Sequence, residues 1–258
     1  MTCIYRVCRT PLSAYVRYPW VAEGYVQLHA REFVLRTGSL TLVIDLDVER
    51  ADAILICGAR SEPLVLGTLK PLRLMAAVFK PGSGFPFAAC PAGELQNLQV
   101  PLTAFWPSET TELREHLLEA PTNGERFLVL ESFLTQRLRA SRPRSPGVHH
   151  AIRQLQGAGP ASSVASVRDQ LDISAQRFIE MFRREVGLPP KAFARLARSG
   201  RVLQRIDRVG DVDWADLALS TGYFDQPHFI GEFRRFAGVT PSAYLRHRTG
   251  RNHVRIAE

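Results

Sequence analysis

The side chains best suited to chemistry lie in the last third of the chain, and they form hydrogen bonds rather than covalent bonds. Arginine donates to guanine or phosphate through a planar fork, glutamine pairs with adenine, and glutamate accepts from the cytosine amino group. Residues of these types recur at helical spacing in two segments. The candidate DNA-contacting residues are Ser174, Gln176, Arg177, Glu180, Arg183 and Arg184 in the first segment, and Asp225, Gln226, His228, Arg234 and Arg235 in the second.

The two segments belong to an internal repeat with an offset of 51 residues. Nine of the eighteen positions from 178 to 195 are identical to their partners between 229 and 246. Each copy has the pattern of a short helix with phenylalanines on one face, arginines on the other, and a glycine at its end. Two basic helical units in tandem indicate a surface that meets nucleic acid twice.

Each candidate helix needs a turn and a supporting helix to present it. Ser174 and Asp225 are suited to cap the N-termini of the two helices. We expect the second turn, from Gly222 to Phe224, to be one residue longer than the first. Gly231 stands mid-helix and costs roughly 1 kcal/mol relative to alanine. The expected helices span residues 148–156, 163–171, 175–186, 190–208, 213–221, 226–236 and 241–248.

Residues 190–208 are expected to join the two units as one stiff helix. Its apolar stripe is assigned to the core, and the arginines are expected to decorate its remaining surface. A fixed connection would hold the two recognition helices about one turn of duplex apart, roughly 34 Å. These arginines are Arg195, Arg198, Arg201, Arg205 and Arg208.

The net charge is distributed unevenly along the chain. Residues 1–146 carry 16 basic and 14 acidic side chains, a balance of +2, and residues 147–258 carry 17 basic and 11 acidic ones, a balance of +6. This favours an anionic partner, although charge alone fits a solvated basic surface equally well. The sequence shows no signal-peptide layout and no apolar run long enough to cross a bilayer, so we expect a cytoplasmic protein that does not enter membranes.

The cysteines predict neither a metal site nor a disulfide framework. Cys3, Cys8, Cys57 and Cys90 form no C-x-x-C pair, and no histidine or cysteine lies at zinc-ligand spacing from them. We therefore expect reduced thiols, no metal, no cofactor and no catalytic residue.

Hydrophobic patterning divides the chain into a β-rich part and an all-α part. Short apolar runs separated by turns predict a small sandwich or open barrel, in which residues 34–46 form strand, glycine turn and strand. The expected organisation is a β-rich domain at 1–104, a helical extension at 105–140, a linker at 141–147, a domain of two helix-turn-helix units at 148–248 and a basic tail at 249–258.

The helical extension carries an apolar stripe whose role the sequence leaves open. Its members fall three or four residues apart and form either a core face against the β domain or a dimer seam; packing within the chain is favoured. The stripe consists of Phe127, Leu130, Leu134 and Leu138.

Residues 148–248 resemble the DNA-binding domain of the AraC/XylS family of bacterial transcription regulators. Residues 173–190 are similar to the first helix-turn-helix of that family, and residues 218–244 carry its signature. The resemblance implies seven helices, with two recognition helices in successive major grooves. The signature is Ala218-x-x-x-Gly222-Tyr223-Phe224-Asp225-Gln226-x-His228-Phe229-x-x-x-Phe233-Arg234-Arg235-x-x-Gly238-Val239-Thr240-Pro241-x-x-Tyr244.

Departures from the family pattern shape the expected readout. Arg168 stands where the family usually has alanine, arginine is frequent at the positions of Gln176 and Glu180, and Gly231 replaces a long or basic side chain. We expect the first recognition helix to supply most direct base readout and the second to grip mainly the DNA backbone.

The N-terminal part resembles the β-rich sensor domains attached to some AraC-type regulators, through residues 35–46 and 78–82. This resemblance implies a β-rich sandwich or cupin-like sensor domain with a small-molecule effector or a homodimer. Such a regulator implies RNA polymerase as a further partner, bound to double-stranded DNA. Two alternatives remain open. One is a DNA-repair methyl-acceptor or enzyme fused to the same DNA-binding module. A methyl-acceptor needs a zinc-bound reactive cysteine cluster, and the four cysteines of this sequence do not match one. The other is an oligomerisation domain without a ligand.

Overall fold

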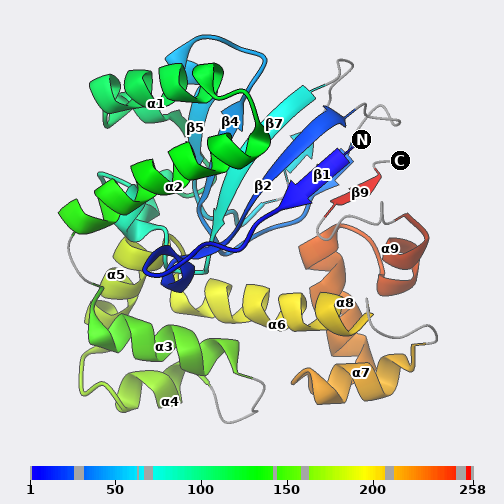
Figure 1. Cartoon of the computed structure of the whole chain (residues 1–258). Helices are drawn as coiled ribbons and strands as arrows, with labels where there is room; N and C mark the ends of the chain where they lie inside the picture. Colours follow the sequence, from blue (N-terminus) through cyan, green and yellow to red (C-terminus); the bar gives the residue numbers. More distant parts are fainter. Residues whose placement is uncertain are drawn as a thin grey trace.

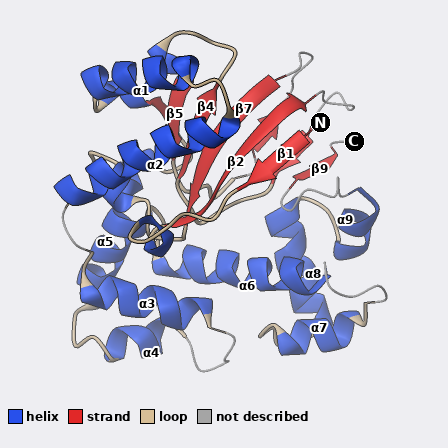
Figure 2. Ribbon diagram, in the orientation of Figure 1, coloured by secondary structure: helices blue, strands red, loops and turns tan. Residues whose placement is uncertain are grey.

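The computed structural model describes residues 2–25, 32–62, 64–66, 72–141, 144–157, 163–206, 212–247 and 254–256. Strands gather in one part of the molecule and most helices in the other (Figure 2). The expected combination of a β-rich part with helices and an all-α part with two helix-turn-helix units is confirmed. None of the described helices has the length and apolar character that a membrane crossing requires.

Two antiparallel sheets make up the β-rich part. The larger has six strands in the order β1-β2-β7-β4-β5-β8, and the smaller has the order β6-β3-β9. The strands are β1 (Thr2–Tyr5), β2 (Val16–Tyr25), β3 (Glu32–Val34), β4 (Thr41–Asp45), β5 (Ile54–Cys57), β6 (Leu64–Leu66), β7 (Leu72–Phe79), β8 (Gln99–Pro101) and β9 (Val254–Ile256). Short 3-10 helices connect them: η1 (Leu12–Ala14), η2 (Ala51–Ala53), η3 (Phe85–Phe87), η4 (Ala92–Leu95) and η5 (Leu102–Ala104).

Alternation of apolar and polar residues places one face of the larger sheet in the core. Leu42 and Ile44 of β4 and Ile54 and Ile56 of β5 are buried, while the residues between them are partly exposed. Helices α1 (Pro107–Glu119) and α2 (Asn123–Ala140) cover this sheet (Figure 1).

The apolar stripe of α2 belongs to this core. Phe127, Leu130 and Leu134 are buried in the same cluster as the strand residues, and Leu138 packs against it. The expectation of packing within the chain is thus confirmed, and the stripe is not free to serve as a dimer seam.

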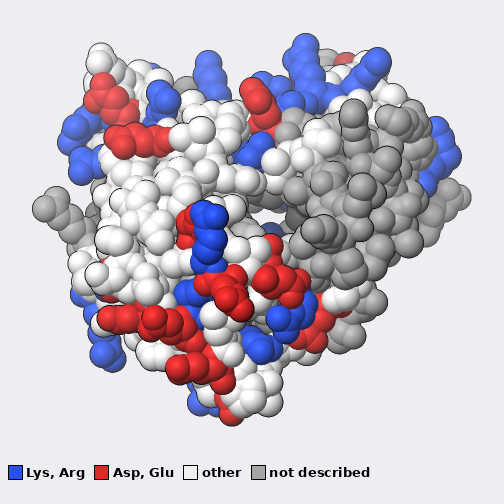
Figure 3. Space-filling model, turned by 90° about the horizontal axis from the view of Figure 1, so that it is seen from above, with Lys and Arg blue, Asp and Glu red and all other residues white. Residues whose placement is uncertain are grey.

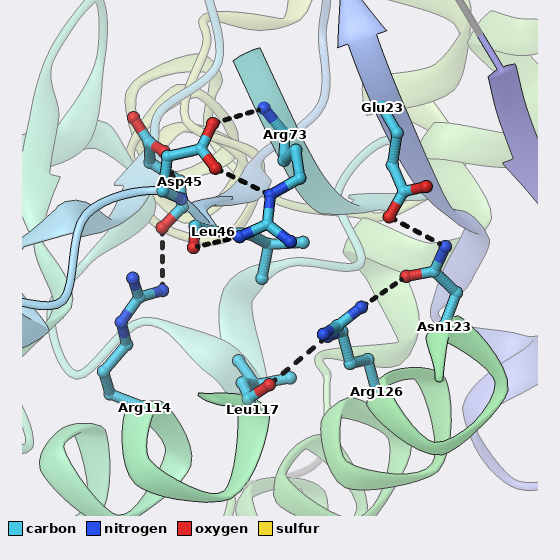
Figure 4. Close-up of polar contacts among 9 residues, drawn as sticks. Glu23, Asp45, Leu46, Arg73, Arg114, Leu117, Asn123 and Arg126 are labelled. Atoms are coloured by element: carbon cyan, nitrogen blue, oxygen red, sulfur yellow. Dashed lines mark hydrogen bonds and ion pairs between the residues drawn. The ribbon is translucent and has the colours of Figure 1, made fainter. Parts of the chain in front are cut away.

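Charged side chains fasten the covering helices to the strands (Figure 4). Arg114 of α1 is buried and donates to the Asp45 carbonyl at 2.7 Å. Burial lowers the pKa of its guanidinium. From α2, Asn123 donates to the Glu23 carboxylate of β2 at 3.1 Å, and Arg126 donates to the Leu117 carbonyl of α1. These contacts orient α1 and α2 on the sheet.

The C-terminal part consists of helices close to the expected ones. They are α3 (Pro146–Gln156), α4 (Val164–Asp169), α5 (Ala175–Val186), α6 (Pro190–Ile206), α7 (Trp214–Ser220), α8 (Gln226–Ala237) and α9 (Pro241–His247). The expected ends at residues 208 and 248 lie outside the described residues. Helices α3 to α5 lie at one end of α6, and α7 to α9 lie at the other (Figure 1).

Of the strand, glycine turn and strand expected at residues 34–46, the second strand is confirmed as β4, but the first is wrong because β3 ends at Val34. β3 and β4 lie in different sheets, and the chain between them packs on the helical part. Leu35 is fully buried among apolar side chains of α6, α7 and α8, and a β-carbon at Gly38 would touch the Phe193 ring of α6 at 3.4 Å. Long-range packing, which a local strand pattern does not report, holds residues 35–38 against the helical part instead of in a strand.

The linker and the tail also connect the two parts. Residues 139 and 140 extend α2, and α3 already begins at Pro146. Arg144 donates to the Ser83 hydroxyl at 2.6 Å. In the tail, residues 254–256 form β9, which pairs with β3; its remaining residues, 249–253 and 257–258, lie outside the described residues. The domain boundaries stay predictions.

Candidate nucleic-acid interface

The first helix-turn-helix unit consists of α4 and α5. The Ser174 side chain accepts a hydrogen bond from the Arg177 amide at 3.2 Å and caps α5, as the sequence predicts. Phe178 and Phe182 are fully buried in a cluster with Val167 of α4. This packing leaves the opposite face of α5 in solvent.

The exposed face of α5 carries most of the predicted contact residues. Gln176, Arg177, Glu180 and Arg184 are all exposed. Gln176 donates through Nε2 to Glu180 Oε1 at 3.0 Å, so a hydrogen bond within the helix orients its amide in the free protein. The amide nitrogen carries two N–H groups, so one of them and the carbonyl oxygen remain available to a further partner.

Arg183 lies nearer the β-rich part than the other predicted residues of α5. A β-carbon at Gly93 of η4 would lie 2.9 Å from Arg183 Cγ and 3.3 Å from its Nε. The C-terminal end of α5 thus packs against η4, while its first turns face solvent.

Glu185 is a polar residue of α5 that the sequence analysis missed. It is buried and accepts hydrogen bonds from the Ser145 amide, at 3.2 Å to Oε2, and from the Ser145 hydroxyl. Burial lowers the pKa of the neighbouring Arg144, and the Glu185 charge opposes that shift. Because Glu185 sits one residue after two arginines, its sequence context offers no signal for this role.

The second unit consists of α7 and α8. Asp225 accepts from the His228 amide at 2.7 Å and caps α8, as predicted. Phe229 and Phe233 are fully buried, and their rings lie 5.8 Å apart. The same helix, cap and phenylalanine ridge therefore occur in both units.

The turn lengths differ from the sequence prediction. The first turn runs from 170 to 174 and the second from 221 to 225, so each has five residues. What differs is the position of the left-handed residue. It is Asp172, with a φ of 49°, in the first turn, and Gly222, with a φ of 89° and one repeat position earlier, in the second. Gly222 in the sequence suggested that the second turn has one more residue. The two turns are instead equally long, and the left-handed residue stands one repeat position earlier in the second turn.

The exposed surface of α8 is sparser than that of α5. His228, Arg234 and Arg235 are exposed and Gln226 is half-buried. His228 accepts a 3.5 Å contact from the Phe224 amide at Nδ1. A β-carbon at Gly231 would meet nothing within 4 Å, so this part of the surface is open.

The arginines of α6 do more than decorate its surface. Arg195 and Arg198 form ion pairs with Glu232 of α8 at 3.1 and 3.4 Å, and Arg198 also lies 5.1 Å from the centre of the Tyr223 ring. Arg201 donates to the Gln156 and Thr221 carbonyls at 3.1 and 3.4 Å.

These contacts fix the second unit on the connecting helix. Burial and then the charge of Arg198 lower the pKa of Arg201. Burial raises the pKa of Tyr223, which stays a neutral phenol beneath Arg198. With 17 residues, α6 is about 25 Å long and places the two units at its ends.

Charge is mixed on one face of the molecule. The face seen from above the sheet shows acidic and basic groups intermingled with uncharged side chains (Figure 3). The exposed side of α1 carries Glu112, Glu115 and Glu119. This face is therefore not uniformly basic, and the glutamates of α1 disfavour a polyanion there.

Comparison with known protein families identifies the helical part. Residues 167–247 match a helix-turn-helix domain family of the AraC type. The C-terminal part of this chain is an AraC-type helix-turn-helix domain. The match begins within α4 and ends with α9, so the AraC-type domain includes both units and the helix that joins them.

The remaining comparisons describe the other half and the whole chain. Residues 8–101 match a domain of unknown function, DUF6597. No curated protein matches the chain. Solved structures of ToxT from Vibrio cholerae are similar at 12% identity: one has a TM-score of 0.43 and covers 90% of this chain and 94% of its own. The structure of ToxT bound to an unsaturated fatty acid has a TM-score of 0.42 and covers 92% and 93%.

Proposed function

We propose that this protein is a transcription regulator of the AraC/XylS family that binds a specific sequence in double-stranded DNA through both units. The observation that carries the proposal is the repetition of one layout within an AraC-type domain. Each unit has a capped helix, held by two buried phenylalanines, with polar and basic side chains in solvent. A helix of this kind fits the major groove, where side chains read base edges.

The two units are proposed to divide the work of binding. The first offers Gln176 and Glu180, which can pair with adenine and cytosine, whereas the second offers the phosphate-binding Arg234 and Arg235 around the gap at Gly231. The first helix then supplies most hydrogen-bonded readout, and the second mainly holds the backbone.

Selection of binding sites from random duplexes tests the proposal. We expect one sharply defined half-element and one weakly defined one, and an affinity that falls steeply with salt as arginine contacts release counterions. Binding no tighter than to random DNA would remove the claim of specificity. Two equally sharp half-elements would contradict the division of work.

Gln176→Ala provides the matching variant. We expect it to lose about 1–3 kcal/mol of discrimination at one A·T pair, because the bidentate amide contact disappears. Gln136→Ala is the control, since Gln136 is an exposed glutamine on α2 of the β-rich part. Fluorescence anisotropy on the selected duplex and on its base-substituted forms measures both variants.

We also propose that the N-terminal part regulates DNA binding, through a small-molecule effector or through dimerisation. Support comes from its direct packing against α5, where a β-carbon at Gly187 would lie 3.0 Å from the Ala92 carbonyl of η4. A change in this part would therefore be felt at a recognition helix. Contact with RNA polymerase and a cytoplasmic location follow from the proposed role and remain proposals with it.

The cysteines disfavour the alternative of a methyl-acceptor. Nucleophilic attack on an alkyl group needs a thiolate. Burial raises the pKa of Cys8 and of Cys57 to about 11, which keeps both thiols protonated at neutral pH. Mass spectrometry after incubation with methylated DNA tests this alternative, and a methyl group on any cysteine would revive it.

A further inference from the structure

Phe224 is the most exposed large apolar side chain in the part of the chain that the structure describes, with 84% of its surface in solvent. It directly precedes Asp225, the residue that caps recognition helix α8. An apolar residue at this position normally packs on the residue four places into the helix and fixes how the chain enters it. In α8 that residue is Phe229, which is fully buried and does not cover Phe224.

The first unit provides an internal comparison. The repeat offset of 51 aligns Phe224 with Ile173 and Phe229 with Phe178. Ile173 is half-buried and packs on the cluster that contains Phe178, as the usual arrangement requires. The second unit therefore departs from a packing scheme that its own sister unit follows.

The shifted backbone of the second turn explains the departure. Because Gly222 takes the left-handed conformation, Tyr223 turns inward and its ring lies 5.2 Å from that of Phe229. Tyr223 thus fills the place that Ile173 takes in the first unit, and Phe224 turns outward. Its amide contacts His228 Nδ1, so the backbone that carries the exposed ring is held in place.

An exposed phenyl ring at the N-terminal end of a recognition helix requires an apolar feature in the groove it enters. In the major groove, the distinct apolar group is the C5-methyl of thymine, which phenylalanine can contact. Residues at the start of a recognition helix are those that reach base edges. The neighbouring Arg234 and Arg235 of the same helix suit a polyanion.

We propose that Phe224 is a specificity-determining residue that contacts a thymine methyl group in the half-element bound by the second unit. This inference rests on the proposed function. It adds one apolar base contact to a helix that otherwise holds the DNA backbone, and it predicts a single thymine preference within the weakly defined half-element.

Replacement of each thymine by deoxyuridine tests the contact, because deoxyuridine keeps every hydrogen bond and lacks only the methyl group. Anisotropy on the selected duplex should show one thymine in the second half-element whose replacement weakens wild-type binding about four-fold. Phe224→Ala should weaken binding to the unmodified duplex by a similar or larger factor and should abolish the effect of deoxyuridine at that position. Phe224→Leu should keep part of it.

Leu219→Ala is the matched control. Leu219 lies on α7 of the same unit, is 63% exposed, and stands away from the start of α8 in the sequence. It should keep the wild-type response to deoxyuridine. Thermal unfolding of Phe224→Ala should match wild type, because the removed ring makes little contact with the fold.

The failures of the two proposals are distinguishable. If wild-type protein binds the selected duplex no better than random DNA, the proposed function falls and this inference falls with it. If wild type binds specifically but no deoxyuridine matters, or if Phe224→Ala keeps every deoxyuridine effect, only the thymine contact is refuted. Equal losses by Phe224→Ala on selected and random DNA would also refute it, because they indicate a backbone contact.

Discussion

At the scale of single residues, Glu180 has the most unusual place on the proposed DNA-binding surface. Its carboxylate is exposed on α5 and accepts from Gln176 at 3.0 Å. A negative charge at this position repels phosphates, yet it can accept from a cytosine amino group. Under the proposed function, we therefore expect Glu180 to lower the affinity for all DNA and to raise the preference for one base.

Glu180→Ala should separate these two effects. We expect a several-fold gain in affinity for random DNA, because a like charge is removed, together with loss of preference at one C·G pair. Anisotropy with random and selected duplexes at equal salt measures both. Glu115→Ala, an exposed glutamate of α1, serves as control. Weaker binding of Glu180→Ala to random DNA would show that the carboxylate does not face phosphate.

The phenylalanine ridge is expected to act through stability alone. The fully buried Phe233 ring contacts those of Phe229, Phe236 and Tyr244, with centroids 5.6 to 6.0 Å away. Phe233→Ala should lower the free energy of unfolding by about 3–5 kcal/mol, and Phe233→Leu by less, because the cavity is smaller. Urea denaturation measures this loss, and an unchanged midpoint for Phe233→Ala would contradict the packing.

At the scale of elements, the β-rich part contacts a proposed recognition helix where η4 packs against the C-terminal end of α5. Gly187 ends α5 with a φ of 89°, and a β-carbon there would lie 3.0 Å from the Ala92 carbonyl. Gly222 has the same φ, but a β-carbon there would meet nothing within 4 Å.

This pair of glycines isolates the contribution of the contact with η4. Gly222→Ala should cost about 1–2 kcal/mol, the backbone term for a left-handed residue. Gly187→Ala should cost about 1–3 kcal/mol more, because its methyl group also overpacks against η4. Chemical denaturation compares the two variants. Equal losses in the free energy of unfolding would show that η4 moves away from the added methyl group at no cost.

The elements that sequence predicted are those that local patterns determine. The seven C-terminal helices follow from apolar periodicity and from caps such as Ser174 and Asp225, which act within one turn. The ion pair of Arg195 and the burial of Leu35 depend on partners far away in the sequence. Periodicity carries no information about such partners. The sequence therefore predicted which residues are exposed on the candidate helices, but not the contacts that hold those helices in place.

At the scale of the whole molecule, the linker and α5 form one polar joint. Glu185 accepts from Ser145, and Arg144 donates to Ser83 of the β-rich part. Glu185→Ala should lower the free energy of unfolding by about 1–3 kcal/mol, since it leaves the half-buried Ser145 amide and hydroxyl without this partner. It should also speed hydrogen exchange at the start of α3 and the end of α5. Glu180→Ala, on the exposed face of the same helix, should not change exchange there, and equal protection in both variants would contradict the joint.

Two units at the ends of α6 require that the bound DNA be contacted twice on one side. Hydroxyl-radical footprinting of the selected duplex tests this requirement most directly. The proposed function predicts two protected patches about one helical turn apart, near 10 base pairs, on the same face of the duplex. A single patch, or uniform protection along the duplex, would contradict it.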